Sequence, residues 1–184
     1  MSRDLCVEVP AIPAYRVRWA DARWEIEQAY ALRRVVFCEE QGIFRGDDRD
    51  AVDDAAQLLV AVELADERTG APGQVVGTVR IHESEPGVWY GSRLAVAQPH
   101  RRHGRIGATL IRLAVSSAHA LGCKRFLAHV QSQNVPLFRR LHWSTLAEEM
   151  LLGRPHHLMQ ANLHDYPPCH TPFAGFAIEG RRGI

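Results

Sequence analysis

The sequence predicts an α+β fold in which helices pack against a mixed, mostly antiparallel sheet. Three observations lead to this prediction. Segments with strand-like patterns outnumber segments with helical patterns. Residues 75–82 and 88–96 are apolar runs joined by a turn at Pro86-Gly87, which is typical of an antiparallel hairpin or meander. A single strand–loop–helix–strand crossover follows in the second half of the chain.

The first elements follow from local patterns. Residues 15–19 alternate apolar and basic side chains, which indicates a half-buried strand. We expect Asp21 to cap a helix over residues 24–37, whose apolar side chains recur at helical spacing. Residues 42–54 form an acidic loop that is too polar for the core, and the compact apolar run 58–64 indicates a buried strand.

A second helix is expected from Ile106, because its apolar residues form one stripe that ends before a C-cap glycine, Gly122. The remaining elements are expected in the order strand, short helix, strand and strand, over residues 125–130, 135–141, 144–151 and 157–163. We therefore assign residues 1–165 to one domain. Residues 166–184 are rich in proline and glycine, and we expect an extended C-terminal tail or linker there.

Composition excludes several classes of function. A chain of 184 residues fits one domain, and a net charge of +1 argues against binding nucleic acid by broad phosphate neutralisation. No apolar run approaches the roughly 20 residues that span a bilayer, and the N-terminus lacks the pattern of a secretory signal. Four widely spaced cysteines form no metal signature, so we expect reduced thiols, no bound metal and a cytoplasmic protein.

The most informative stretch is the basic loop that precedes the second helix. A strand ends, the loop Arg102-His103-Gly104-Arg105-Ile106-Gly107 follows, and an amphipathic helix begins. Free N–H groups at a helix N-terminus and the helix dipole both favour a bound phosphate. The glycines let a ligand approach the backbone, and the charges of this loop and Arg101 suit a pyrophosphate. The alternative is a solvated basic turn at the start of an ordinary helix.

The surrounding residues carry a family resemblance. The stretch Ser92-Arg93-Leu94-Ala95-Val96, followed by Pro99 and Arg102, resembles the coenzyme A loop of the GNAT acetyltransferase superfamily. That loop reads Arg/Gln-x-x-Gly-x-Gly/Ala. Arg102 falls on its leading arginine and Gly107 on its closing glycine, while Arg105 replaces the central glycine.

Further motifs resemble the ElaA-like bacterial branch of this superfamily. The segment Arg34-Val35-Val36-Phe37-Cys38-Glu39-Glu40-Gln41-Gly42, followed by Asp47, Asp50 and Asp53, resembles its first-helix signature, which acyl-homoserine-lactone synthases share in part. Ala128-His129-Val130-Gln131 resembles its fifth strand, and Gly153-Arg154-Pro155-His156-His157-Leu158-Met159 resembles a late motif. The resemblance spans about residues 16–163.

The resemblance implies a GNAT-like sheet with a splayed central strand pair and a pantetheine arm between the two strands. It also implies transfer of an acetyl group from acetyl-CoA to a small-molecule amine, by a protein for which a homodimer is possible. A backbone N–H, that of Leu94, would polarise the thioester carbonyl. The residues that the resemblance assigns to coenzyme A are Leu94, Ala95, Val96, Arg101, Arg102, His103, Gly104, Arg105, Ile106, Gly107, Asn134 and Phe138.

The general acid is the main departure from the superfamily. Phe138 stands where the superfamily has a tyrosine, and it has no proton to donate. His142 and Tyr90 are the nearest substitutes. A positioned acid typically contributes about 10²–10⁴-fold, so the change predicts slow turnover, a substitute donor, or a non-catalytic acyl-CoA sensor. An acyl-homoserine-lactone-synthase-like acyltransferase is a further alternative.

The general base also has several candidates. His129 is expected on the strand beside the thioester, and histidine titrates near neutral pH, although a lone strand histidine is more often structural. Glu40 comes from the end of the first helix and is either a base or a solvated carboxylate. Other candidates are His82, Glu83 and Glu85. The acidic loop also contains a group of aspartates, Asp47, Asp48, Asp50, Asp53 and Asp54. These residues either form a rim that attracts a cationic amine or are simply solvated surface.

Overall fold

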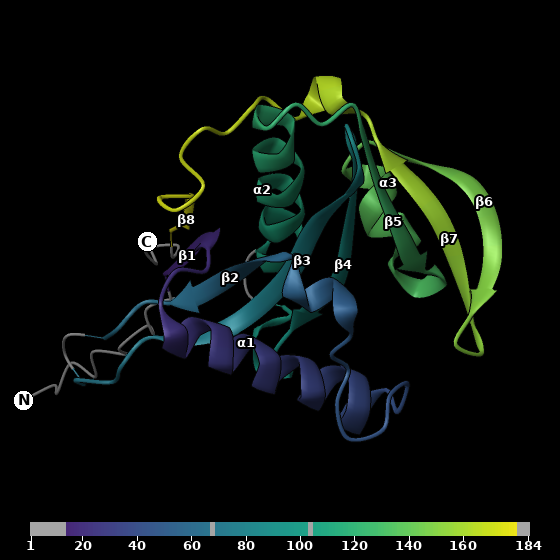
Figure 1. Ribbon diagram of the computed structural model, residues 1–184. Helices are drawn as coiled ribbons and strands as arrows, with labels where there is room; N and C mark the ends of the chain where they lie inside the picture. Colours follow the sequence, from purple (N-terminus) through teal and green to yellow (C-terminus); the bar gives the residue numbers. More distant parts are fainter. Residues whose placement is uncertain (1–13, 67–68, 103–104, 180–184) are drawn as a thin grey trace, which may run out of the picture.

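The computed structural model describes residues 14–66, 69–102 and 105–179, and within them it confirms the α+β prediction (Figure 1). An eight-stranded sheet has the order β6-β7-β5-β4-β3-β2-β1-β8, and all neighbouring pairs are antiparallel except β4 and β5. In chain order the elements are β1 (Tyr15–Trp19), α1 (Arg23–Arg34), the π-helix η1 (Val35–Glu40), the 3₁₀ helix η2 (Ala51–Asp54), β2 (Gln57–Glu63), β3 (Gln74–Glu85), β4 (Val88–Val96), η3 (Gln98–His100), α2 (Ile106–Ala120), β5 (Arg125–Gln131), η4 (Ser132–Asn134), α3 (Val135–Arg140), β6 (Trp143–Leu151), β7 (Arg154–Ala161), η5 (Leu163–Asp165) and β8 (Phe176–Ile178).

The helices α1 and α2 cover opposite faces of the sheet (Figure 1). On β2, Leu59 and Ala61 pack in the cluster that contains α2, whereas Leu58 and Val60 pack in the cluster that contains Ala29 of α1. Successive strand residues point to opposite faces, so both faces of β2 are buried. This explains why β2 reads as a continuous apolar run rather than an alternating one.

The start of α2 lies very close to the sheet. A Cβ atom added at Gly77 of β3 would lie 2.9 Å from Ile106 Cγ2 and 3.0 Å from Leu110 Cδ1. Only glycine leaves room for this approach, because real Cβ atoms do not tolerate such a contact with packed side chains. Gly77 therefore fixes the height of the helix N-terminus above the sheet.

Three predicted boundaries are wrong. Asp21 does not cap α1: the N-cap is Ala22, and the buried Glu25 carboxylate accepts from the N–H groups of both residues, at 2.9 and 3.1 Å. The predicted α-helix to residue 37 ends at Arg34, after which the chain becomes a π-helix. The last predicted strand begins earlier, at Arg154, because Pro155 is accommodated near the strand start.

The central strands β4 and β5 diverge, as the resemblance implied (Figure 1). Their parallel pairing covers only three residue pairs and ends at Tyr90 and Leu127. Both strands continue beyond that point, β4 to Val96 and β5 to Gln131. The backbone groups on the facing edges of these later residues are therefore not consumed by β4–β5 pairing.

The segment after residue 165 contributes one strand. Within it, β8 pairs with β1 at the edge of the sheet, opposite to the edge formed by β6. The domain boundary expected at residue 165 stays a prediction. In the part of the chain that the structure describes, no helix has both the length and the apolar character needed to cross a membrane. In the same residues, no group of three His, Cys, Asp or Glu side chains is arranged to hold a metal ion.

Candidate active site

A cavity of about 450 Å³ lies among residues of the diverging strands β4 and β5 and their neighbours. Six residues that the sequence offers for the site line it, namely His82, Tyr90, Leu94, His129, Asn134 and Phe138. Its volume falls in the range of about 300–1,000 Å³ that is typical of small-ligand sites. The chain is thus folded so that the predicted thioester strand and the predicted base share one cavity.

A β-bulge shapes the β4 wall of this cavity. The register of β3 with β4 runs from Arg80↔Ser92 to Thr78↔Ala95, so Arg93 and Leu94 together oppose one residue of β3. Arg93 has φ 57°, a left-handed conformation that costs a non-glycine residue about 1–2 kcal/mol. The bulge takes Leu94 out of the ladder at the point where it lines the cavity.

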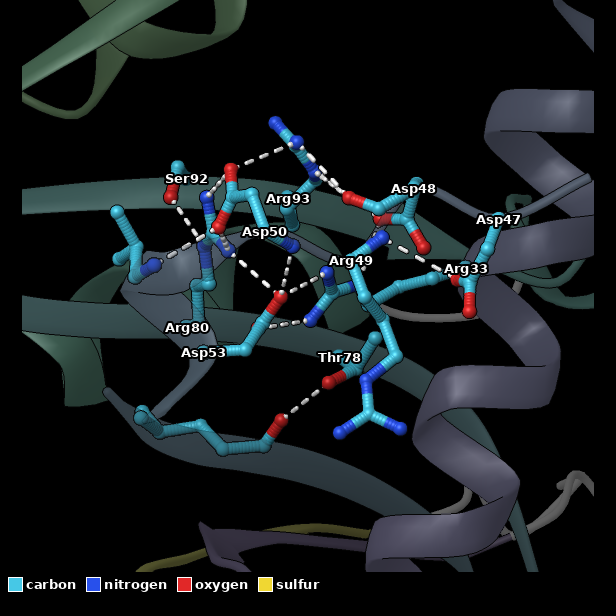
Figure 2. A network of polar contacts seen from close by, with 12 residues as sticks. Arg33, Asp47, Asp48, Arg49, Asp50, Asp53, Thr78, Arg80, Ser92 and Arg93 are labelled. Carbon is cyan, nitrogen blue, oxygen red and sulfur yellow. Dashed lines mark hydrogen bonds and ion pairs between the residues drawn. The ribbon is translucent and has the colours of Figure 1, made fainter. Parts of the chain in front are cut away.

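The side chain of Arg93 is fixed by two aspartates of the acidic loop (Figure 2). Its Nε donates to Asp48 Oδ2 at 3.0 Å, and its Nη2 donates to the Asp48 carbonyl at 3.0 Å and to Asp50 Oδ2 at 3.2 Å. The guanidinium also lies 4.4 Å from the centroid of the Phe44 ring. These contacts stabilise the strained backbone conformation at the bulge.

Two further arginines complete the network in Figure 2. Arg33 of α1, with no exposed surface, donates to Asp48 at 2.7 Å and to both oxygens of Asp53 at 2.7 and 3.0 Å. Arg80 of β3 donates to both oxygens of Asp50, at 2.6 and 3.0 Å, and lies 2.9 Å from Asp53 Oδ2. With Arg93, three arginines face three aspartates, and their formal charges cancel.

The network shifts the ionisation of its carboxyl groups. Hydrogen bonds from Arg80 hold the pKa of Asp50 below its ordinary value. Burial opposes ionisation of Asp53, but hydrogen bonds from Arg33 and the Asp50 backbone outweigh it and hold the pKa of Asp53 far below its ordinary value. The expectation of a solvated or amine-attracting rim is therefore wrong for Asp48 and Asp53, whose side chains are buried in ion pairs with arginines. Asp50 is ion-paired with Arg80, but its side chain stays 42% exposed.

The basic loop lies at the junction of β4, η3 and α2. Arg101 donates to the Val96 carbonyl at 2.9 Å and forms an ion pair with Glu40 at 2.5 Å. Glu40, a candidate base, is therefore tied to the loop and does not line the cavity. Arg105 is the N-cap of α2 with φ 30°, and Ile106 is buried beneath it.

The remaining loop residues differ in their surroundings. Arg102 is exposed, Ala95 is buried, and Gly107 has room for a side chain, because a Cβ there would meet only Val96 Cγ2, at 3.9 Å. The expected ligand residues His103 and Gly104 lie outside the described residues.

His129 belongs to a stack of rings from three strands. His82 of β3, Tyr90 of β4 and His129 of β5 lie with successive centroids 5.9 and 5.8 Å apart and interplanar angles of 21° and 11°. Burial and the nearby Arg80 lower the pKa of His82, so its ring is neutral at neutral pH. His129 Nδ1 is hydrogen-bonded to the carboxylate of Glu149 on β6.

The two candidate substitutes for the missing tyrosine are placed differently. Phe138 is buried and packs edge-on against Trp143, with centroids 5.0 Å apart. Tyr90 lines the cavity beside His129. His142 lies in the turn between α3 and β6, 64% exposed and 3.8 Å from Asp165, and does not line the cavity. Of the two candidate donors, Tyr90 is therefore the one that shares the cavity with the candidate base His129.

Sequence reasoning missed Glu149 and the role of Arg33. Glu149 and His129 come from β6 and β5, which are separated by β7 in the sheet, so their contact depends on two strand registers. No local pattern reports such a pairing. The signal for Arg33 was present, because a basic residue in an amphipathic helix precedes three aspartates that need partners.

A mixed sheet with a splayed central pair, a cavity at the splay, and a basic strand-to-helix junction define an acyltransferase fold. The family model described as the Acetyltransferase (GNAT) family matches residues 14–143. The chain belongs to this family. A search of curated proteins gives no match.

Solved structures share this fold at low sequence identity. Escherichia coli ElaA is 16% identical with a TM-score of 0.66, and the match covers 82% of this chain and 99% of ElaA. The CoA-dependent acyl-homoserine lactone synthase BjaI is 18% identical with a TM-score of 0.63, covering 79% and 82%. A chimera of spermidine N-acetyltransferase SpeG from Vibrio cholerae with hSSAT is 18% identical, with a TM-score of 0.59, covering 83% and 97%.

Proposed function

We propose that this protein is an acyl-CoA-dependent N-acyltransferase that moves an acetyl group from acetyl-CoA to a small-molecule amine. The observation that carries the proposal is the divergence of β4 and β5 after Tyr90 and Leu127, with a cavity where they separate. Family membership supports acyl transfer, and the names of the solved relatives include an N-acetyltransferase and a CoA-dependent synthase.

The residues present fit coenzyme A. Beyond Tyr90, the edge of β4 that faces β5 has no β5 partner, so Leu94, Ala95 and Val96 offer hydrogen-bonding groups there to the pantetheine arm, and Asn134 and Phe138 also line the cavity. The exposed loop cations and the N-terminus of α2 suit the pyrophosphate. The loop residues in this proposal are Arg101, Arg102, His103, Gly104, Arg105, Ile106 and Gly107.

Bound acetyl-CoA supplies an acetyl thioester, and the chain's own groups do the rest. The Leu94 N–H donates a hydrogen bond to the thioester oxygen. His129 Nε2 accepts the proton that the amine loses, because Glu149 engages Nδ1 and so leaves Nε2 as the acceptor. Tyr90, whose ring stacks on that of His129, is the donor that protonates the departing thiolate. The cytoplasmic location and the homodimer remain predictions.

Acetyl-CoA binding is tested by the melting temperature. At 100 times its Kd, a ligand adds about 2.7 kcal/mol, which is about 5–10 °C for a chain of this size. Arg102→Ala combined with Gly107→Asp should abolish the shift, since it removes a cation and adds an anion where the Gly107 environment has room. Arg23→Ala, on a side chain that is 91% exposed on α1, is the matched control and should leave the shift unchanged. No shift at millimolar acetyl-CoA refutes the proposal.

A second candidate function is a non-catalytic acyl-CoA-binding domain, favoured by the buried Phe138 in place of a proton donor. It predicts the same thermal shift but no release of free CoA with any amine. Measurement of CoA release with a panel of amines separates the two functions, because CoA release with any one amine excludes a non-catalytic binding domain.

A further inference from the structure

The part of the cavity away from the basic loop has an apolar wall. Phe37 of η1 and Phe44 of the following loop line it, together with Leu151 and Leu152 of the β6–β7 hairpin. The ring stack of His82, Tyr90 and His129 also lines the cavity. Burial of an apolar or aromatic ligand group against such a wall makes its binding free energy more favourable, and rings in a stack favour contact with a further aromatic ring.

The same cavity offers no carboxylate. Among the described residues that line it there is no aspartate or glutamate, whereas Arg80 and Arg93 do line it. The aspartates nearest to these arginines are already engaged in the ion pairs of Figure 2. Glu149 lies beside the ring stack, but its carboxylate is already hydrogen-bonded to His129. A buried ammonium group would therefore meet no anionic partner, which is strongly unfavourable.

Because of the chemistry of acyl transfer, a cavity lined without carboxylates discriminates between monoamines and polyamines. The amine must be neutral to attack, so the base removes one proton from its ammonium form. The nitrogen then forms a C–N bond as the C–S bond breaks, a second proton leaves the nitrogen, and the thiolate of CoA departs and takes up a proton. A monoamine carries no charge after the first proton is removed. A polyamine keeps its other charges throughout, and those charges need carboxylates.

We propose that the acceptor of this site is a monoamine with an aromatic or apolar body, and not a polyamine or another polycation. The proposal rests on the proposed acyl-CoA-dependent function and specifies its substrate class. The aromatic body packs on the apolar wall and the ring stack, and its amino group lies next to His129. This substrate class differs from that of the spermidine N-acetyltransferase of the same fold, whose name specifies a polyamine.

The test compares phenethylamine with spermidine at saturating acetyl-CoA, measured as CoA release. We expect kcat/KM for phenethylamine to exceed that for spermidine at least about tenfold. Calorimetry on the protein–CoA complex gives a readout besides activity, and phenethylamine should bind more tightly there too. Equal or better use of spermidine in either measurement overturns the substrate class.

A matched pair of variants tests the electrostatic cause. Leu152 lines the cavity but is 63% exposed, so a polar residue is tolerated there. Leu152→Glu should raise spermidine turnover and lower the ratio of kcat/KM for phenethylamine to kcat/KM for spermidine. Leu152→Gln, which has the same size but no charge, should change neither. An unchanged preference in Leu152→Glu contradicts the electrostatic reasoning. Acetyl-CoA binding without phenethylamine binding overturns the substrate class alone, whereas loss of acetyl-CoA binding itself refutes the proposed function.

Discussion

Replacing Asp53 with asparagine perturbs the centre of the arginine–aspartate network. The carboxylate receives two hydrogen bonds from Arg33, at 2.7 and 3.0 Å, and lies 2.9 Å from Arg80. The arginines are 0% and 3% exposed. Asparagine keeps the shape but leaves one buried positive charge without compensation. Breaking a buried ion pair in this way costs about 3–5 kcal/mol.

The loss is measurable by urea denaturation and by melting temperature. At about 2–4 °C per kcal/mol for this chain length, Asp53→Asn should melt about 6–20 °C lower. The matched control is Glu27→Gln, which breaks an ion pair with Arg23 whose side chains are 60% and 91% exposed, and it should cost no more than about 1 kcal/mol. Equal losses in the two variants would refute the assignment of stability to the network.

Acid titration of the unaltered protein gives a second measurement that does not depend on a variant that folds. The pKa of Asp53 is depressed in the folded state, so the folded state binds fewer protons than the unfolded chain at acidic pH. The stability from this group is complete above the ordinary aspartate pKa and is lost as pH falls below about 4. Stability that stays constant from about pH 6 to about pH 3 would contradict the same reasoning.

Two other predictions concern catalysis and packing. His129→Gln should lower kcat by about 10²–10⁴-fold, with little change in KM for acetyl-CoA. Glu149→Gln should lower kcat by less and displace the pH–rate profile, and an unchanged profile would exclude an orienting role for Glu149. The control is Glu148→Gln, because the Glu148 side chain is 81% exposed. Gly77→Val should cost about 1–3 kcal/mol by overpacking against α2, and an unfolding curve that matches the unaltered protein would show that the helix can move.

Much of the fold could be predicted from sequence because its signals are local. The alternation at β1, the turn at Pro86-Gly87 and the helical stripe from Ile106 each depend on neighbours a few residues apart. Boundaries failed where a distant side chain decided them. Glu25, in the first turn of α1, accepts from the N–H groups of Asp21 and Ala22, the two residues before the helix, and the N-cap is Ala22 rather than Asp21.

The candidate site was predictable only where the chain itself brings residues together. Leu94, His129 and Phe138 could be placed at one cavity because the resemblance supplies strand order. The pairing of Glu149 with His129 crosses an intervening strand, and the three-to-three matching of arginines and aspartates depends on tertiary packing. The sequence pattern of the acidic loop accordingly indicates solvated surface, although three of its aspartates are the counterions of arginines on α1, β3 and β4.

The π-helix η1 has a consequence for comparing this chain with its relatives. Its wider turn, marked by the hydrogen bond from Gln41 N–H to the Val36 carbonyl at 3.0 Å, delivers Phe37 to the cavity and Glu40 to Arg101. Such turns are rare and recur at functional sites. Deleting one residue would restore α-helical winding but rotate every later side chain by about 100°. The length of this segment, more than its residue types, therefore decides which of its side chains face the cavity. An alignment that closes a one-residue gap here would equate positions that point in different directions.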